Sequence, residues 1–218
     1  LPKYPIKPNI TDDTIMAKMA LEHYMKYKTV IEDELLATYK KWAITSGLDD
    51  GIGIHTYNVL VKNVCDKDSQ GNGALMRNIP FALQMYEDGY SFHECVKMMN
   101  TDSFLTHQND TIAVTNQLSL DLAINGIGVL SKDEYKDIIS KLHYGDTAWV
   151  IHSLYIVIEA LKQNLNYTKG FKYITSIGGD TDTNCAIFGA IKSFKYDVTK
   201  ELDISKFVDI NSIKLFEI

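Results

Sequence analysis

The stretch Gly178–Phe194, GGDTDTNCAIFGAIKSF, combines a helix signal with a dense run of oxygen-bearing side chains. Its second half carries apolar side chains at three- and four-residue intervals, so a helix is predicted over Thr183–Phe194. Its first half joins two glycines to the acidic tetrad Asp180–Thr183. The stretch therefore predicts a helix whose amino-terminal end is rich in side-chain oxygens.

The same helical periodicity continues outward along the chain. From Asp12 onward the apolar side chains follow one buried helix face, and Pro80 is placed in the first turn of a helix that runs to Gly89. Further helices are predicted over Ile31–Thr45, Thr111–Ile124 and Ala148–Leu161. No convincing strand alternation is present in the sequence. The predicted fold class is therefore all-α, with residues 1–218 as a single domain.

Capping boxes and glycines predict where several helices begin and end. The pairs Ser91 with Glu94 and Ser131 with Glu134 match the pattern in which Ser accepts an amide bond and Glu returns one. Each pair is expected to open a helix. Glycines expected to separate helices lie at positions 126, 145, 170 and 178–179.

The composition excludes several classes of protein. The chain has 218 residues with 22 basic and 28 acidic side chains, and this acidic balance excludes nucleic acid as a primary partner, because phosphate binding needs a basic face. No apolar run approaches the ~18 residues that a membrane span needs. The three widely spaced cysteines, Cys65, Cys95 and Cys185, are expected to be free thiols, which favours a reducing, cytoplasmic location.

Two acidic tetrads, Thr11–Thr14 and Asp180–Thr183, stand at the starts of predicted helices. One interpretation is helix capping, because Thr and Asp are good N-caps and Asp complements the helix dipole. The other is a metal centre, because each tetrad holds two carboxylates that repel unless a cation offsets their charge. Hard oxygen ligands suit Mg²⁺, Mn²⁺ or Ca²⁺ better than zinc. Two ions sharing these carboxylates are expected if the fold brings the helix starts together.

The loop Gly71–Arg77, GNGALMR, precedes the helix at Pro80. Glycines on both sides of Asn72 allow positive φ and leave backbone amides exposed, which suits a phosphate near a helix amino terminus. A tight turn is the alternative interpretation, and Arg77 is expected to be a surface or paired cation.

His107 lies in the tripeptide Leu105–His107 and, taken alone, is expected to be a partly exposed capping or loop residue. The other five histidines have no partner spacing that suggests a metal site or a triad. A Ser-His-Asp mechanism is not supported either, because no Gly-x-Ser-x-Gly elbow is present.

Four motifs, taken in order, resemble the motif series of the ADP-ribosylglycohydrolase family. They are TDDT at Thr11–Thr14, GNGALMR at Gly71–Arg77, LTH at Leu105–His107 and GGDTDTNCA at Gly178–Ala186. The segment Tyr144–Leu161 also resembles the penultimate helix of the family. The resemblance covers about residues 11–194, and the last motif is the most specific of the four.

The resemblance implies an all-α orthogonal helical bundle with a binuclear Mg²⁺ or Mn²⁺ centre. The metal ligands it implies are Thr11, Asp12, Asp13, Asp180, Asp182 and Thr183. The four aspartates among them would also be the catalytic residues, with one carboxylate acting as a base toward water. The substrate-binding residues it implies are Gly71, Asn72 and Gly73, near a diphosphate, and His107. The implied partner is an ADP-ribosylated protein or a small ADP-ribose conjugate.

The amino-terminal end departs from the family pattern. Members usually carry a glycine-rich segment ending in a Glu before the TDDT motif, whereas the ten residues before Thr11 contain neither Gly nor Glu. Three explanations are open. The segment lies outside this sequence, another carboxylate substitutes for its Glu, or the protein binds its ligand without efficient turnover. The predicted function is a metal-dependent hydrolase that releases ADP-ribose. The alternatives are a catalytically impaired ADP-ribose- or metal-binding module and a structural protein with capped helices.

Overall fold

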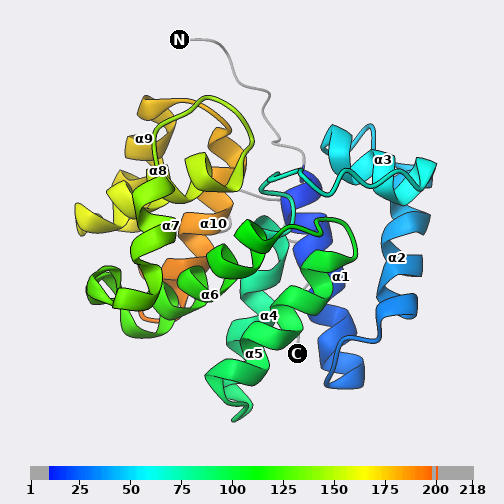
Figure 1. Cartoon of the computed structure of the whole chain (residues 1–218), viewed down its shortest axis with the longest axis horizontal. Helices are drawn as coiled ribbons and strands as arrows, with labels where there is room; N and C mark the ends of the chain where they lie inside the picture. The colour runs from blue at the N-terminus through cyan, green and yellow to red at the C-terminus, as the bar shows by residue number, and fades with distance from the viewer. Residues whose placement is uncertain (1–9, 198–199, 201–218) are drawn as a thin grey trace.

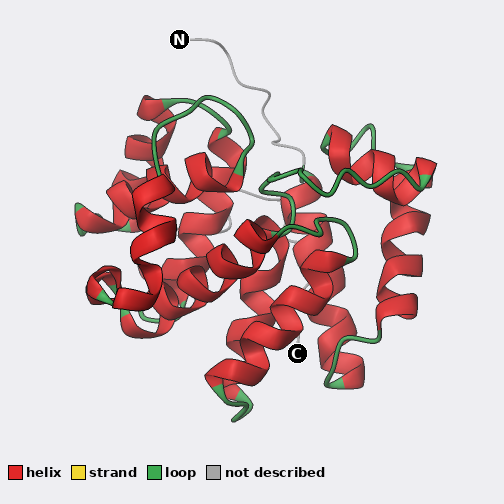
Figure 2. Ribbon diagram, viewed as in Figure 1, coloured by secondary structure: helices red, strands yellow, loops and turns green. Residues whose placement is uncertain are grey.

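A computed structural model describes residues 10–197 and residue 200, and this part of the chain is all-α, as predicted (Figures 1 and 2). It contains ten α-helices, two short 3₁₀ helices and no strand. The α-helices are α1 Asp12–Tyr27, α2 Glu32–Thr45, α3 Ile54–Lys62, α4 Leu75–Glu87, α5 Phe92–Phe104, α6 Asp110–Asn125, α7 Lys136–Lys141, α8 Val150–Lys162, α9 Tyr167–Ile177 and α10 Thr181–Ser193. The 3₁₀ helices are η1 Ile127–Ser131 and η2 Asp133–Tyr135.

Helix α4 is the centre of the packing. It contacts α1, α5, α6 and α10, and Figure 1 shows it between α1 on one side and α10 on the other. Leu75, Ile79 and Phe81 of α4 are fully buried, and burial of each such side chain contributes about 1.5–3 kcal/mol. Because α1 and α10 also contact each other, the fold holds the helices of the two acidic tetrads together.

The buried apolar side chains form one continuous cluster, to which all ten α-helices contribute. The single domain predicted over residues 1–218 stays a prediction, because both ends of that range lie outside the described residues. None of the described helices combines the length and the apolar character that crossing a membrane requires. Cys65, Cys95 and Cys185 are free, as predicted.

Two predicted helix boundaries are wrong because tertiary packing overrides the local signal. Pro80 lies inside α4, which begins at Leu75, since buried side chains extend the helix toward its amino terminus. Gly170 was expected to separate two helices, but it lies inside α9. A Cβ atom there would lie 2.4 Å from Cζ of Phe188, so Gly170 serves the close packing of α9 on α10.

One of the two predicted capping boxes forms. The Ser91 hydroxyl accepts from the Glu94 amide and the Glu94 carboxylate accepts from the Ser91 amide, at the start of α5. Ser131 instead ends η1 and donates to the Gly128 carbonyl, while α7 begins only at Lys136. The sequence pattern for the second box was therefore not sufficient, because 3₁₀ turns occupy that segment.

The two serines give a matched test of capping. Ser91→Ala is expected to lower the free energy of unfolding by about 0.5–2 kcal/mol, because an amide at the start of α5 loses its acceptor. Ser131→Ala, as the control, is expected to change it by less than about 0.5 kcal/mol. Urea unfolding measures both values, and equal losses at the two positions would contradict the assignment.

Candidate functional site

Both acidic tetrads open helices, and neither N-cap residue caps its helix through its side chain. Thr11 precedes α1 and Asp180 precedes α10, and neither side chain bonds to a backbone amide of its helix. The Thr11 hydroxyl instead donates to Oδ2 of Asp13 at 3.1 Å. Side-chain capping by these two N-cap residues therefore does not account for the tetrads.

The fold brings Asp12 of the first tetrad to the same cavity as three residues of the second, a cavity of about 290 Å³. Thr11 and Asp13 are not among the residues that line it. Its lining includes eight residues singled out from the sequence: Asp12, Gly71, Asn72, Gly73, His107, Asp180, Asp182 and Thr183. Asp13 is 4% exposed and accepts a hydrogen bond from the Thr183 side chain. Residues separated by more than 150 positions in the chain thus meet at one site.

Burial and mutual repulsion raise the pKa values of three of the aspartates. Burial first, and then the charge of Asp13, raise the pKa of Asp12 to about 7, although the Gly53 amide opposes this rise. Burial raises the pKa of Asp13 to about 6, with the nearby charge of Asp182 adding to it. Burial and contact with Asp182 likewise raise the pKa of Asp180. The tetrads therefore form a crowded set of carboxylates.

The chemistry of these side chains fits a hard divalent cation. Among the described residues, no Lys or Arg forms an ion pair with the four aspartates. The buried Oδ1 atom of Asp13 has no hydrogen-bond partner there, and leaving a buried polar atom unsatisfied costs free energy. Within the same part of the chain, no three His, Cys, Asp or Glu side chains already form a ligand shell. The oxygen atoms of these side chains are suitable ligands for a cation, although in the described residues they are not already arranged as a ligand shell.

Asn72 joins the glycine loop to the second tetrad. Its side-chain amide donates to Oδ2 of Asp180 at 2.8 Å and to the Ser153 hydroxyl at 2.9 Å. Its backbone amide donates to the Ala148 carbonyl at 2.9 Å. Asn72, predicted as a substrate-binding residue, therefore also positions Asp180.

Gly71 and Gly73 pack closely against His107, and neither uses the positive φ that glycine allows. A Cβ atom on Gly71 would lie 2.9 Å from Nε2 of His107, and one on Gly73 would lie 3.2 Å from its Cε1 atom. His107 is only 1% exposed, which corrects the expectation of a partly exposed loop residue. Burial, helped by the charge of Arg77, lowers the pKa of His107 well below its usual value. His107 is therefore neutral at neutral pH and offers no positive charge to a diphosphate.

The sequence predicted that Arg77 is either a surface cation or a paired one, and the structure shows the paired one. Its buried side chain supports the loop Gly71–Arg77 from inside the protein. The fully buried guanidinium donates to the Asp102 carboxylate at 2.9 Å, to the Gly73 carbonyl at 3.0 Å and to the Thr106 hydroxyl at 3.0 Å. Thr106 in turn bonds to Nδ1 of His107 at 2.8 Å. One buried cation thus fixes both the glycine loop and His107.

Several side chains of the cavity were not predicted from the sequence. Trp149 lines the cavity, and an antiparallel bridge pairs its backbone with Gly71. His55 and Thr56, at the start of α3, line it as well. The only sequence signal for Trp149 is an aromatic residue at the start of a predicted helix, and this signal does not distinguish a site from a core.

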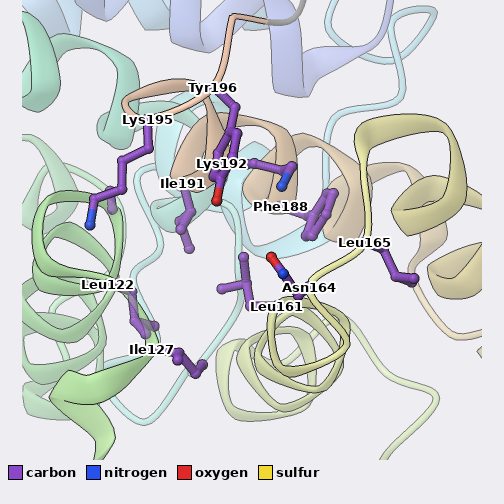
Figure 3. Close-up of a pocket in the computed structure, with 12 residues that line it drawn as sticks. Leu122, Ile127, Leu161, Asn164, Leu165, Phe188, Ile191, Lys192, Lys195 and Tyr196 are labelled. Atoms are coloured by element: carbon purple, nitrogen blue, oxygen red, sulfur yellow. The ribbon is translucent and has the colours of Figure 1, made fainter. Parts of the chain in front are cut away.

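A second cavity of about 180 Å³ lies apart from the tetrads, with residues of α6, α8 and α10 in its wall (Figure 3). Apolar side chains such as Leu122, Leu161 and Phe188 line it, together with Lys192 and Lys195. None of the residues that the sequence predicts for the site lies there, so the tetrad cavity is the candidate functional site.

Comparisons with known proteins agree with this fold. Residues 2–142 match the sequence model of the ADP-ribosylglycohydrolase family. A protein of Acanthamoeba polyphaga mimivirus, named "Putative ADP-ribosyl glycohydrolase", is 26% identical over 237 residues, covering 86% of this chain and 71% of its own length. A solved structure titled "ADP-ribosylglycohydrolase-related protein complex" has a TM-score of 0.70 at 16% identity, covering 94% of this chain and 78% of that one.

The fold and the family match define an all-α protein of the glycohydrolase class. The chain belongs to the ADP-ribosylglycohydrolase family, as its motifs predicted.

The buried ion pair under the loop predicts a large stability loss. Arg77→Met is expected to lower the free energy of unfolding by about 3–5 kcal/mol, because Asp102 is left buried without its partner. Lys141→Met, which breaks the exposed pair with Asp137, is the control and is expected to cost less than about 1 kcal/mol. Denaturant unfolding compares the two, and similar small losses would show that the Arg77 pair is dispensable.

The raised pKa of Asp12 predicts how stability changes with pH. In the folded state Asp12 keeps its proton up to pH about 7, whereas the unfolded chain releases it near 3.8, so the folded state binds more protons between these values. Stability from this group therefore falls as pH rises through that interval. With chelator present, the parent is expected to lose stability relative to Asp12→Asn between pH 4 and 7, as urea unfolding at several pH values measures. Parallel curves for the parent, Asp12→Asn and the exposed control Asp33→Asn would contradict this.

Proposed function

We propose that the protein is a metal-dependent hydrolase that releases ADP-ribose from a modified protein side chain or a related small conjugate. The observation that carries this proposal is the meeting of two acidic tetrads and a glycine loop at one cavity, in a chain of the ADP-ribosylglycohydrolase family. The name of the mimivirus relative supports the same class of reaction.

The proposed metal ligands come from the two helix starts. They are Thr11, Asp12, Asp13, Asp180, Asp182 and Thr183, and they would hold two Mg²⁺ or Mn²⁺ ions. When bound, such ions supply Lewis-acid chemistry toward sugar oxygens and water. The unpartnered Oδ1 atom of Asp13 supports this assignment, because it lacks any other source of compensation among the described residues.

The proposed base is one of the aspartates that face the cavity. Asp13 is buried, and Asp180 already accepts from Asn72, which leaves Asp12 and Asp182 better placed to take a proton from water. A positioned carboxylate of this kind contributes about 10²–10⁴-fold to the rate of proton transfer chemistry.

The proposed diphosphate position is the loop before α4. The backbone amide of Asn72 is already used by Ala148, so the amides of Gly71 and Gly73 and the amino terminus of α4 are the candidate donors. His107, being neutral, would contribute shape and hydrogen bonding to this part of the cavity.

A catalytically impaired module that binds ADP-ribose or metal is the second candidate. The cavity that supports the hydrolase equally supports binding alone, because the same residues would hold the ligands whether or not the bond is cleaved. Such a module would keep affinity for ADP-ribose while releasing none from a modified protein.

Turnover is tested by incubating the protein with an ADP-ribosylated protein and Mg²⁺ or Mn²⁺. The parent is expected to release ADP-ribose, and Asp12→Ala is expected to slow release about 10²–10⁴-fold, whereas Asp33→Ala is not. Binding of ADP-ribose by calorimetry without release would support the module instead. If the protein neither binds ADP-ribose nor releases it from the modified protein, both proposals are overturned.

Metal removal tests the proposed ligands through stability. A cation that binds only the folded state at 100 times its Kd stabilises it by about 2.7 kcal/mol, so saturating Mn²⁺ is expected to raise the Tm of the parent. Asp182→Asn is expected to reduce the shift, and chelator is expected to reverse it. A Tm unaffected by Mn²⁺ and by chelator would favour tetrads with a structural role only.

A further inference from the structure

The loop between α7 and α8 brings together two histidines that the proposed mechanism does not use. His143 lies in the loop and is exposed, and His152 lies in the first turn of α8 and is buried. Their Nε2 atoms are 3.2 Å apart, and their rings meet edge to face with centroids 4.8 Å apart. The two side chains are therefore joined by a direct hydrogen bond.

The hydrogen-bond partners of His143 and His152 determine which nitrogen of each ring carries the hydrogen when both rings are neutral. The Lys141 carbonyl can only accept, so Nδ1 of His143, 2.8 Å away, carries a hydrogen and its Nε2 atom accepts. His152 then donates from Nε2, and its Nδ1 atom accepts from the Thr147 hydroxyl at 2.8 Å. This chain of hydrogen bonds fixes the position and the tautomer of the His152 ring.

The backbone of the loop closes directly over the same ring. A Cβ atom on Gly145 would lie 2.3 Å from Nδ1 of His152, so only glycine allows this approach. The Tyr144 hydroxyl donates to the Ile177 carbonyl at 3.4 Å, which connects the loop to the end of α9 just before the second tetrad. The His152 imidazole is therefore enclosed on its loop side.

Trp149 stacks against the same ring and is one of the residues that line the cavity. Its indole stacks on the His152 imidazole, with centroids 6.0 Å apart and the planes 17° from parallel. The residue is 47% exposed and lines the cavity that also contains Asp12 and Asp180. Backbone bonds fix where the Trp149 side chain begins, and the stack on His152 favours one direction for the indole.

We propose that His143 and His152 are positioning residues that hold the Trp149 indole as a wall of the cavity. His152 supplies the surface on which the indole rests, and His143 keeps that surface in place from the loop. The consequence for substrate binding rests on the proposed function, whereas the positioning of the indole does not.

Tryptophan fluorescence tests the positioning without any ligand. The chain has two tryptophans, and Trp42 is 6% exposed and donates to Asp50 at 2.8 Å, so acrylamide reaches mainly Trp149. His152→Ala and His143→Ala are expected to shift the emission to the red and to raise the acrylamide quenching constant. His93→Ala, at an exposed histidine on α5, is the matched control and is expected to match the parent. Because His143 is exposed, its variant keeps the test valid if His152→Ala fails to fold.

The same variants test the consequence for the site. Loss of an ordered aromatic wall is expected to raise KM, or the Kd for ADP-ribose measured by calorimetry, roughly two- to tenfold. The kcat value is expected to stay close to that of the parent, because a wall acts on binding rather than on the reacting atoms.

The outcomes separate the positioning from the proposed function. Fluorescence of His143→Ala and His152→Ala equal to that of His93→Ala would overturn the positioning. Altered fluorescence with unchanged KM and Kd would overturn its consequence for substrate. A parent that neither binds nor releases ADP-ribose would overturn the proposed function and that consequence, while the fluorescence would still decide whether the histidines hold the indole.

Discussion

The buried ion pair between Arg77 and Asp102 is the interaction on which the geometry of the site depends. Removing two charges from water costs several kcal/mol per ion, and further hydrogen bonds are needed to offset that cost. Here Asp102 also accepts from the Tyr39 hydroxyl at 2.8 Å, and Arg77 also donates to Gly73 and Thr106. The pair thus joins α2, α4 and α5 and extends to the loop that lines the cavity. A less complete set of partners would leave that loop without its internal support.

The opposite condition holds at the two acidic tetrads. Asp12, Asp13 and Asp180 are partly or fully buried and have raised pKa values, whereas Asp182 is exposed. None of the four has a Lys or Arg partner among the described residues. The buried charges of Arg77 and Asp102 are therefore fully compensated, whereas the aspartates of the two tetrads are not. Uncompensated charge of this kind is common at functional sites, because the compensation is supplied by a ligand.

The sequence predicted what depends on local pattern. Helical periodicity identified most helices, and the density of carboxylates and threonines identified both tetrads before any packing was known. The Ser131 box was wrong because 3₁₀ turns occupy that segment. The helix start at Pro80 and the role of Gly170 were wrong because packing against side chains distant in the chain decides these segments. Trp149 and His55 were missed because contacts distant in the chain bring them to the cavity. The bond from Asn72 to Asp180 spans 108 positions, and no local pattern indicates such a contact.

That bond has a mechanical consequence. Because the Asn72 side chain joins the glycine loop to Asp180, the loop cannot move away from the second tetrad without breaking a hydrogen bond or taking the carboxylate with it. A ligand that orders one of these two parts therefore lowers the entropy cost of ordering the other. Occupancy of the loop and occupancy of the tetrads would then be thermodynamically linked, and each ligand would increase the affinity for the other by the same factor. Asn72 would then be the residue that couples ligand binding at the glycine loop to ligand binding at the second tetrad.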